Sequence, residues 1–217
     1  MKKISILIIL TISVCFSTIH AQVSKGAIFL GGNLSFGTQK VNGAGNTPYL
    51  KQNVYSVSPA FGKVIRENLV LGFDAGISFS KSEYITSSFK NETKAYTAGV
   101  FLRQYRPLGK GFYLFLQERL GYQHEDYENT NTFNPGNDYV RNTVGLNVNP
   151  GLSYAVNKKL HIETGFNNLF YLRYSHEKGN NYNNSSGAPY KANNFDAGVD
   201  LSGFSSLYFG FRLLLNK

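Results

Sequence analysis

Hydrophobic and polar residues alternate along most of this chain with a period of two. The alternation is longest between Val140 and Tyr174, in two runs joined at Asn157-Lys158-Lys159. In each run the bulky apolar residues share one face, whereas glycine, serine, asparagine and charged residues share the other. Because successive side chains of a β-strand point to opposite faces, this stretch predicts a hairpin with one apolar and one polar face.

The small residues lie on the polar face of this hairpin, and the bulky residues lie on the apolar face. A soluble barrel buries its apolar face and presents polar groups to water. Here the crowded side is the polar one, which is typical of a barrel with lipid outside and a tight polar interior.

Eight such segments can be counted, each long enough to cross a bilayer as a tilted strand. They span residues 26–38, 53–64, 69–80, 94–106, 112–124, 140–156, 160–174 and 195–215, the last with a pause at 202–206. Short turns are predicted near residues 66, 108 and 158, and long loops near 45 and over 81–93, 125–138 and 175–194. Their strict alternation predicts an all-β fold, an eight-stranded antiparallel up-and-down transmembrane β-barrel with both ends periplasmic.

Two places break the pattern. Pro59 cannot donate to a β-ladder, so we expect a bulge or a local gap there. Glu118 and Arg119 are neighbours, so a regular strand points one of them at lipid, which costs about 2–4 kcal/mol for a basic residue at the bilayer midplane and less for an acid. A β-bulge near Gln117 would turn both inward, and we predict one.

The first 21 residues form a separate segment. Lys2 and Lys3 precede an apolar run that gives way to small and polar residues before Ala21. This is typical of a cleaved secretory signal peptide over 1–21, followed by the barrel domain over 22–217. A lipoprotein anchored on Cys15 is the weaker interpretation, because Val14 stands where a small residue is usual. Cys15 is the only cysteine, so the mature chain is expected to have no thiol chemistry.

The chain carries a formal net charge of +9. For an exported protein, outer-membrane lipid and anionic lipopolysaccharide are the expected partners of this surplus, and nucleic acid is not. Beyond the first segment no apolar run is long enough for a membrane helix. A closed barrel is the remaining way to cross a bilayer, since every backbone polar group must be paired there.

The alternation places a set of charged residues on the inner face of the predicted barrel. They are Asp74, Arg103, Arg141, Glu163, Arg173, Asp196, Asp200 and Arg212. Because an unpaired buried charge is costly, we expect them to form a polar network. The predicted contacts join Arg212 to Asn33 and Arg173 to Asp196. A proton or small-ion path is the minor alternative.

No catalytic, metal or cofactor site is predicted. Ser153, His161 and Glu163 share the inner face and could be read as a hydrolase triad, but they lie near a short turn and no Gly-x-Ser-x-Gly elbow accompanies them. The histidines show no metal-ligand spacing, and His124 beside two acids at a loop entry would bind a cation only weakly. No phosphate-binding glycine motif occurs.

Several strand-and-turn stretches resemble the porin-like outer-membrane β-barrel family of Gram-negative bacteria. They are residues 58–62 with 67–72, 99–105 before 107–109, 149–154 running into 157–160, and 207–211. The resemblance implies a barrel in the outer membrane, inserted by the barrel-assembly machinery, and no single activity. Members often end on an aromatic residue that this machinery reads, whereas this chain ends in Leu215-Asn216-Lys217.

The sequence therefore predicts a non-enzymatic outer-membrane barrel whose extracellular loops serve surface interaction, adhesion or envelope integrity, with an unknown extracellular partner. One alternative is a narrow porin-like channel for small solutes, and another is an accessory component of an envelope or secretion complex. A soluble barrel that holds a hydrophobic ligand is the third. Conductance would identify the channel, and solubility without detergent would support the soluble barrel.

Overall fold

A computed structural model describes residues 23–42, 48–84, 90–130, 138–180, 189–199 and 207–215. The predicted signal segment and Asp200 lie outside these residues. The described residues form ten strands and no helix. The strands are β1 (Ile28–Asn42), β2 (Pro48–Arg66), β3 (Leu69–Tyr84), β4 (Lys90–Gly109), β5 (Phe112–Thr130), β6 (Tyr139–Ala155), β7 (Leu160–Phe166), β8 (Phe170–Asn180), β9 (Pro189–Val199) and β10 (Leu207–Leu215). No helix in this part of the chain is long and apolar enough to cross a membrane.

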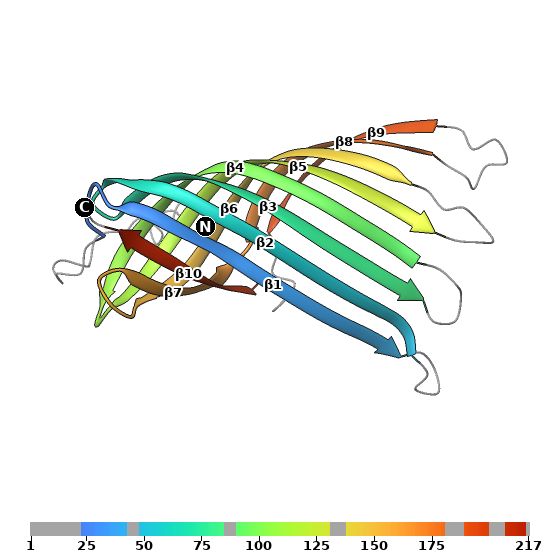
Figure 1. The fold of residues 1–217 in the computed structure, drawn as a ribbon. Helices are drawn as coiled ribbons and strands as arrows, with labels where there is room; N and C mark the ends of the chain where they lie inside the picture. Colours follow the sequence, from blue (N-terminus) through green and yellow to red (C-terminus); the bar gives the residue numbers. More distant parts are fainter. Residues whose placement is uncertain are drawn as a thin grey trace, which may run out of the picture.

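The strands form one antiparallel sheet in the order β5-β4-β3-β2-β1-β10-β7-β6-β8-β9, and β5 also pairs with β6, which closes a barrel (Figure 1). β7 and β8 are two parts of one barrel strand, since both pair with β6. β10 pairs with β7, and β9 pairs with β8, on the edge away from β6. β9 and β10 are therefore two parts of the next barrel strand. The barrel therefore has eight strands, which confirms the sequence prediction.

Short turns join strands at one end of the barrel, as predicted. Asn68 (φ 61°), Lys110 (φ 51°) and Gly111 (φ 83°) adopt the left-handed backbone conformation that such tight turns require. The second turn lies later than predicted, because β4 continues beyond Pro107 with a register shift before Gly109. We call this end the short-turn end of the barrel.

The long connections are shorter than predicted, because the strands continue into them. β3 and β4 reach residues 84 and 90, β5 and β6 reach 130 and 139, and β8 and β9 reach 180 and 189. These hairpins project far from the short-turn end (Figure 1). Their polar residues hide the strand period in the sequence but pair across strands, as Lys81 on β3 does with Glu92 on β4 (3.4 Å).

Pro59 produces a local gap in the ladder between β2 and β3. Val57 pairs with Ile77 and Ala60 with Asp74, but the two residues between have no partner on β3. The register is the same on both sides of the gap. Of the two expectations for a residue without an N–H group, the gap is confirmed and the bulge is not needed.

The bulge predicted near Gln117 is wrong. β5 stays in register with β4 and with β6 throughout this stretch. Arg119 therefore points into the barrel, where it reaches Asp74 directly, and Glu118 points outward. No extra residue is needed to bring the guanidinium to its partner, so the regular strand persists with one carboxylate on its outer face.

The outer surface carries a continuous apolar band. Leu71, Phe73 and Val100 are half exposed on it, as are most large apolar residues of the strands. Aromatic residues border the band on the side of the long hairpins. This aromatic belt consists of Phe36, Tyr55, Tyr96, Tyr122, Tyr174 and Phe195. A band of this kind is typical of a barrel wall that faces lipid.

The interior of the short-turn half holds an aromatic layer. Its buried side chains are Phe29, Phe101, Tyr105, Tyr113, Phe115 and Tyr208, and Val23, Ala27, Val64, Val70 and Leu214 pack beside them. The tight polar interior that the sequence predicts therefore also contains a layer of apolar and aromatic side chains in this half. Glycines provide the room: a Cβ at Gly72 would lie 2.4 Å from Phe101 Cζ, and one at Gly151 would lie 2.2 Å from Phe115 Cζ.

Candidate functional site

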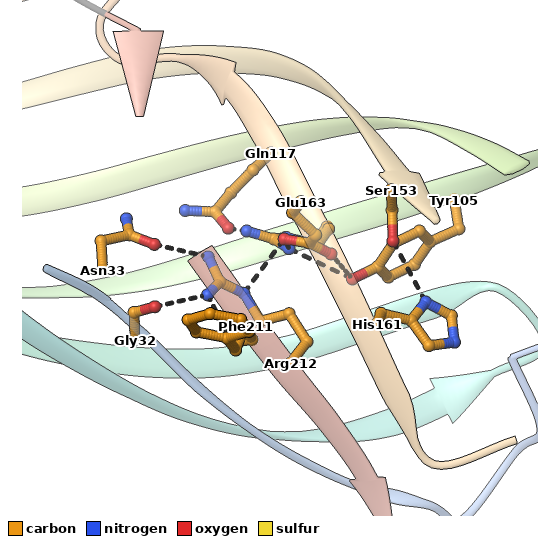
Figure 2. Close-up of polar contacts among 10 residues, drawn as sticks. Gly32, Asn33, Tyr105, Gln117, Ser153, His161, Glu163, Phe211 and Arg212 are labelled. Carbon is orange, nitrogen blue, oxygen red and sulfur yellow. Dashed lines mark hydrogen bonds and ion pairs between the residues drawn. The ribbon is translucent and has the colours of Figure 1, made fainter. Parts of the chain in front are cut away.

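A buried carboxylate lies at the centre of the barrel interior. Glu163 on β7 is 1% exposed and contacts two arginines, which are each 2% exposed. Arg103 Nη1, from β4, lies 2.5 Å from Glu163 Oε2, and Arg212 Nε, from β10, lies 3.1 Å from the same oxygen. Figure 2 shows Glu163 and Arg212 at the middle of this network. Strands distant in sequence are thus joined through one charged group.

Neutral groups satisfy the other polar atoms of this network. The Tyr105 hydroxyl donates to Glu163 Oε1 (2.7 Å), and Arg103 Nε donates to Gln117 (2.8 Å). Arg212 Nη2 donates to Asn33 Oδ1 (2.8 Å), the contact that the sequence predicts. The second terminal nitrogen of Arg212 donates to backbone carbonyls of residues 32 and 211 (Figure 2).

Aromatic rings enclose the charged centre. The Arg103 guanidinium lies 4.4 Å from the Phe115 ring centroid and 5.3 Å from that of Phe29, and Arg212 lies 5.8 Å from Phe29. Such cation–π contacts gain strength where water is excluded. We call the residues Arg103, Glu163 and Arg212, with the surrounding rings, the interior plug.

A second ion pair lies above the plug. Arg119 on β5 donates from Nε and Nη2 to the Asp74 carboxylate on β3, at distances of 2.6–2.9 Å. Gly99 and Gly121 leave space for the Arg119 side chain, since a Cβ at either would clash with it. Asp74 is thus on the inner face as predicted. Its partner is Arg119, for which the sequence predicted an inward direction but no contact.

The predicted contact between Arg173 and Asp196 is present in register but not as an ion pair. The two residues are direct cross-strand partners on β8 and β9. Within the described residues no ion pair joins them, and the Arg173 guanidinium lies over the Tyr171 ring at 4.3 Å. Asp196 is exposed, and like Arg173 it lies on the inner face of its strand, along the lining of the barrel interior. Stacking on the adjacent ring replaces the cross-strand charge pair, so this part of the prediction is wrong.

A polar cavity of about 700 Å³ lies between the plug and the long hairpins. Its described lining runs from Arg103 and Arg212 at the bottom to Glu125 and Arg141 at the top, with amide and hydroxyl side chains between. The sequence predicts an interior filled by side chains, and that holds only for the short-turn half. Small inner residues such as Ser56 and Ser58 leave the other half open.

A third charged cluster lies beyond the aromatic belt. Arg141 on β6 pairs with Glu125 on β5 (3.3 Å) and with Glu177 on β8 (2.6 Å). The hydroxyl of Tyr139 donates to Glu125 (3.1 Å), and that of Tyr190 donates to Glu177 (2.5 Å). This rim cluster ties β5, β6, β8 and β9 together outside the apolar band. Arg141 was predicted to face inward, whereas the other four members of the cluster were missed because they lie in predicted loops or at a strand end.

The rim cluster shifts the ionisation of its own members. Burial, with the hydrogen bond to Glu177, raises the pKa of Tyr190 to about 12. Burial and the nearby Glu125 carboxylate raise the pKa of Tyr139 to about 12. Burial alone would raise the pKa of Glu177, but hydrogen bonds from Tyr190 and Arg141 outweigh it and lower that pKa below its ordinary value.

These shifts predict an alkaline transition in the hairpins. A tyrosine whose pKa is raised on folding contributes stability below its unfolded pKa of about 10, and this contribution disappears as the pH rises toward 12. We expect protease resistance of the long hairpins to fall across this window. In a tyrosinate absorbance titration, Tyr190→Phe should remove one step near pH 12 and Glu177→Gln should move that step down. An unchanged curve for both variants would contradict the assignment.

The hydrolase triad is not assembled. Ser153 Oγ lies 3.1 Å from His161 Nδ1, but Glu163 bonds Arg103 and Tyr105 instead of the imidazole. Ser153 is 0% exposed and His161 is 3% exposed, so no substrate reaches them. These residues are part of the packed short-turn half. In the described part of the chain no group of three or more potential metal ligands is close enough to hold an ion.

No model of a known protein family matches this chain, and no curated protein matches it. Among solved structures it is similar to Neisserial surface protein A, with a TM-score of 0.42 and 14% identity, covering 87% of this chain and 99% of that one. It is also similar to a major outer membrane protein from Thermus thermophilus, with a TM-score of 0.43 and 11% identity, covering 90% and 100%. At these values the likeness supports no functional argument.

Proposed function

We propose that this protein is a non-enzymatic integral barrel of the outer membrane of a Gram-negative bacterium. The observation that carries the proposal is the inverted distribution of its side chains. Large apolar groups form the outer band under an aromatic belt, and charged, amide and hydroxyl groups line the interior. A water-soluble barrel would have to expose that whole band to solvent, which is unfavourable for so large a contiguous surface.

The interior plug favours a closed barrel over a channel. Arg103, Glu163 and the rings around them fill the cross-section of the short-turn half, and all are buried. The polar cavity ends at this plug. A solute that entered from the long hairpins would have to displace the buried ionic centre of Arg103, Glu163 and Arg212, so we propose that the barrel is not a pore for small solutes.

The long hairpins are the part best suited to surface interaction. They continue as paired strands beyond the aromatic belt, and the rim cluster around Arg141 fixes their positions. Lys40, Lys51 and Lys178 stand on their outer sides, where basic groups would meet lipopolysaccharide phosphates. We propose that these hairpins are a preformed binding surface at the cell exterior, which supports adhesion or envelope integrity.

Two measurements on membrane-extracted protein test this function. In SDS electrophoresis we expect unheated and boiled samples to migrate differently, because a closed barrel resists the detergent until it is heated. In planar bilayers the reconstituted protein should show no steady conductance. Recovery of the protein in a soluble fraction without detergent would contradict the membrane barrel, and steady channel currents would favour the narrow porin-like alternative.

A further inference from the structure

Among the described residues, one carboxylate side chain lies inside the apolar band. Glu118 points outward from β5, with Leu116 and Leu120 on either side of it along the strand. Its neighbours across the ladders are Leu102 on β4 and Val148 on β6. The outward residues of β5 run from Phe112 near the short turn to Tyr122 in the aromatic belt. Glu118 is therefore at the middle of the band, away from both of its borders.

A second polar side chain lies next to it. Gln104 points outward from β4 and pairs with Leu116, two residues before Glu118. The two are diagonal neighbours, about 7–8 Å apart by sheet geometry. Thr164 is the other hydroxyl or amide in the band among described residues, and it donates to the Tyr208 carbonyl (3.0 Å). We call Glu118 and Gln104 the polar pair of the β4–β5 wall.

The polar pair has no partner within its own chain. In the described structure neither side chain makes a hydrogen bond or an ion pair, and no lysine or arginine lies beside Glu118 in the ladders. In lipid an unpaired carboxylate is costly and finds no water to solvate it. Polar side chains in such positions are commonly satisfied by a neighbouring transmembrane element.

We propose that the β4–β5 wall is a contact surface between two copies of this chain in the membrane. The inference rests on the proposed membrane-barrel function. A second copy supplies what the wall lacks, because the Gln104 carboxamide carries N–H donors and the Glu118 carboxylate only accepts. Two walls related by a two-fold axis along the membrane normal present the same pair to each other, so the donors of each copy serve the other's carboxylate.

The surroundings of the pair suit a close approach. Val100, Leu102 and Leu114 lie around it, and each is 38–54% exposed in the single chain. Apolar packing alone gives little preference for protein over lipid, so the hydrogen bonds select this wall from the others. A different transmembrane protein as the occupant would need a matching donor and acceptor, whereas the second copy already carries both.

Single cysteines test the contact, because the chain has one cysteine, Cys15, within the predicted signal segment. Leu116→Cys places a thiol on the proposed wall, and Phe211→Cys places a matched thiol on β10, which is three barrel strands away from β5. In intact membranes under mild oxidation, we expect disulfide-linked dimers from Leu116→Cys and not from Phe211→Cys. Equal yields from both would indicate random collisions and overturn the proposal.

Removing the polar pair tests its part in the contact. In the Leu116→Cys background, Glu118→Leu with Gln104→Leu should weaken dimerisation about tenfold, as expected for the loss of two membrane hydrogen bonds. Thr164→Val is the matched control and should change nothing. Dimers that persist without the pair, or crosslinks to another protein alone, would overturn the proposal. Heat-shifted migration must remain in every variant, and its loss would instead count against the membrane barrel.

Discussion

Replacing Glu163 with alanine is expected to destabilise the folded barrel by about 3–5 kcal/mol, the usual cost of removing one partner from a buried ion pair. The substitution would leave Arg103 and Arg212 facing each other, each 2% exposed, without the carboxylate that both contact. Tyr105 would also lose its acceptor. The aromatic layer covers the two guanidinium groups on the short-turn side, so only the polar cavity could supply water to them, and no anion would balance their charge.

Urea-dependent unfolding in detergent, followed by the fraction of heat-shifted protein on gels, measures this loss. Glu163→Gln retains an acceptor of the same shape and should lose less. Replacing all three charged residues with apolar residues of similar size should recover most of the stability, because well-packed apolar groups often substitute for a buried ion network at little cost. Asp74→Ala is the partly exposed control. A Glu163→Ala loss no larger than that of Asp74→Ala would contradict a closed plug.

The barrel fold could be predicted from the sequence because the features that define it, strand alternation and short turns, are local along the chain. Alternation assigns each side chain to a face, and the short turns fix which strands are neighbours, so the inward positions of Arg103, Glu163 and Arg212 follow from residue parity alone. Alternation does not say which inward residues meet across the interior. Arg103 and Glu163 are 60 positions apart, and their contact depends on how far each strand is shifted along the barrel axis.

The errors have a common physical origin. The bulge near Gln117 was predicted because a charge facing lipid is unfavourable, yet the regular ladder of β5 keeps Glu118 outside. The long loops were predicted from polar composition, although ion pairs such as Lys81 with Glu92 stabilise paired strands there. In both cases backbone pairing outweighs a single side-chain preference, since β3, β4 and β5 are each held by ladders on both sides.

The open half of the barrel near the long hairpins and the filled short-turn half differ in the size of their inward side chains, which alternation does not report. The size of each inward residue matters as well as its face. Large inward rings such as Phe101 and Phe115 concentrate near the short turns, whereas serine and asparagine line the other half. A hydrophobic-versus-polar pattern assigns both groups to one inner face, so the division between plug and cavity became visible only with the strands in register.

Gly151→Val should be nearly as damaging as the loss of Glu163, with an expected cost of about 3 kcal/mol for overpacking at a closed site. A Cβ at Gly151 would lie 2.2 Å from Phe115 Cζ and 2.5 Å from the Thr164 carbonyl oxygen. The ring cannot retreat, because it is 1% exposed and lies under the Arg103 guanidinium. The carbonyl belongs to the paired strand β7, so moving it breaks the ladder.

The clash with the Phe115 ring and the clash with the Thr164 carbonyl can be separated by experiment. Gly37→Val is the matched control on β1, since a Cβ there meets nothing within 4 Å, and it should leave urea-dependent unfolding unchanged. Gly151→Ala combined with Phe115→Leu removes the clash with the ring but keeps the one with the Thr164 carbonyl. Partial recovery relative to Gly151→Ala alone is expected. Full stability of Gly151→Val by itself would mean that the strands can separate there, and the plug would then not be the rigid floor on which a closed barrel depends.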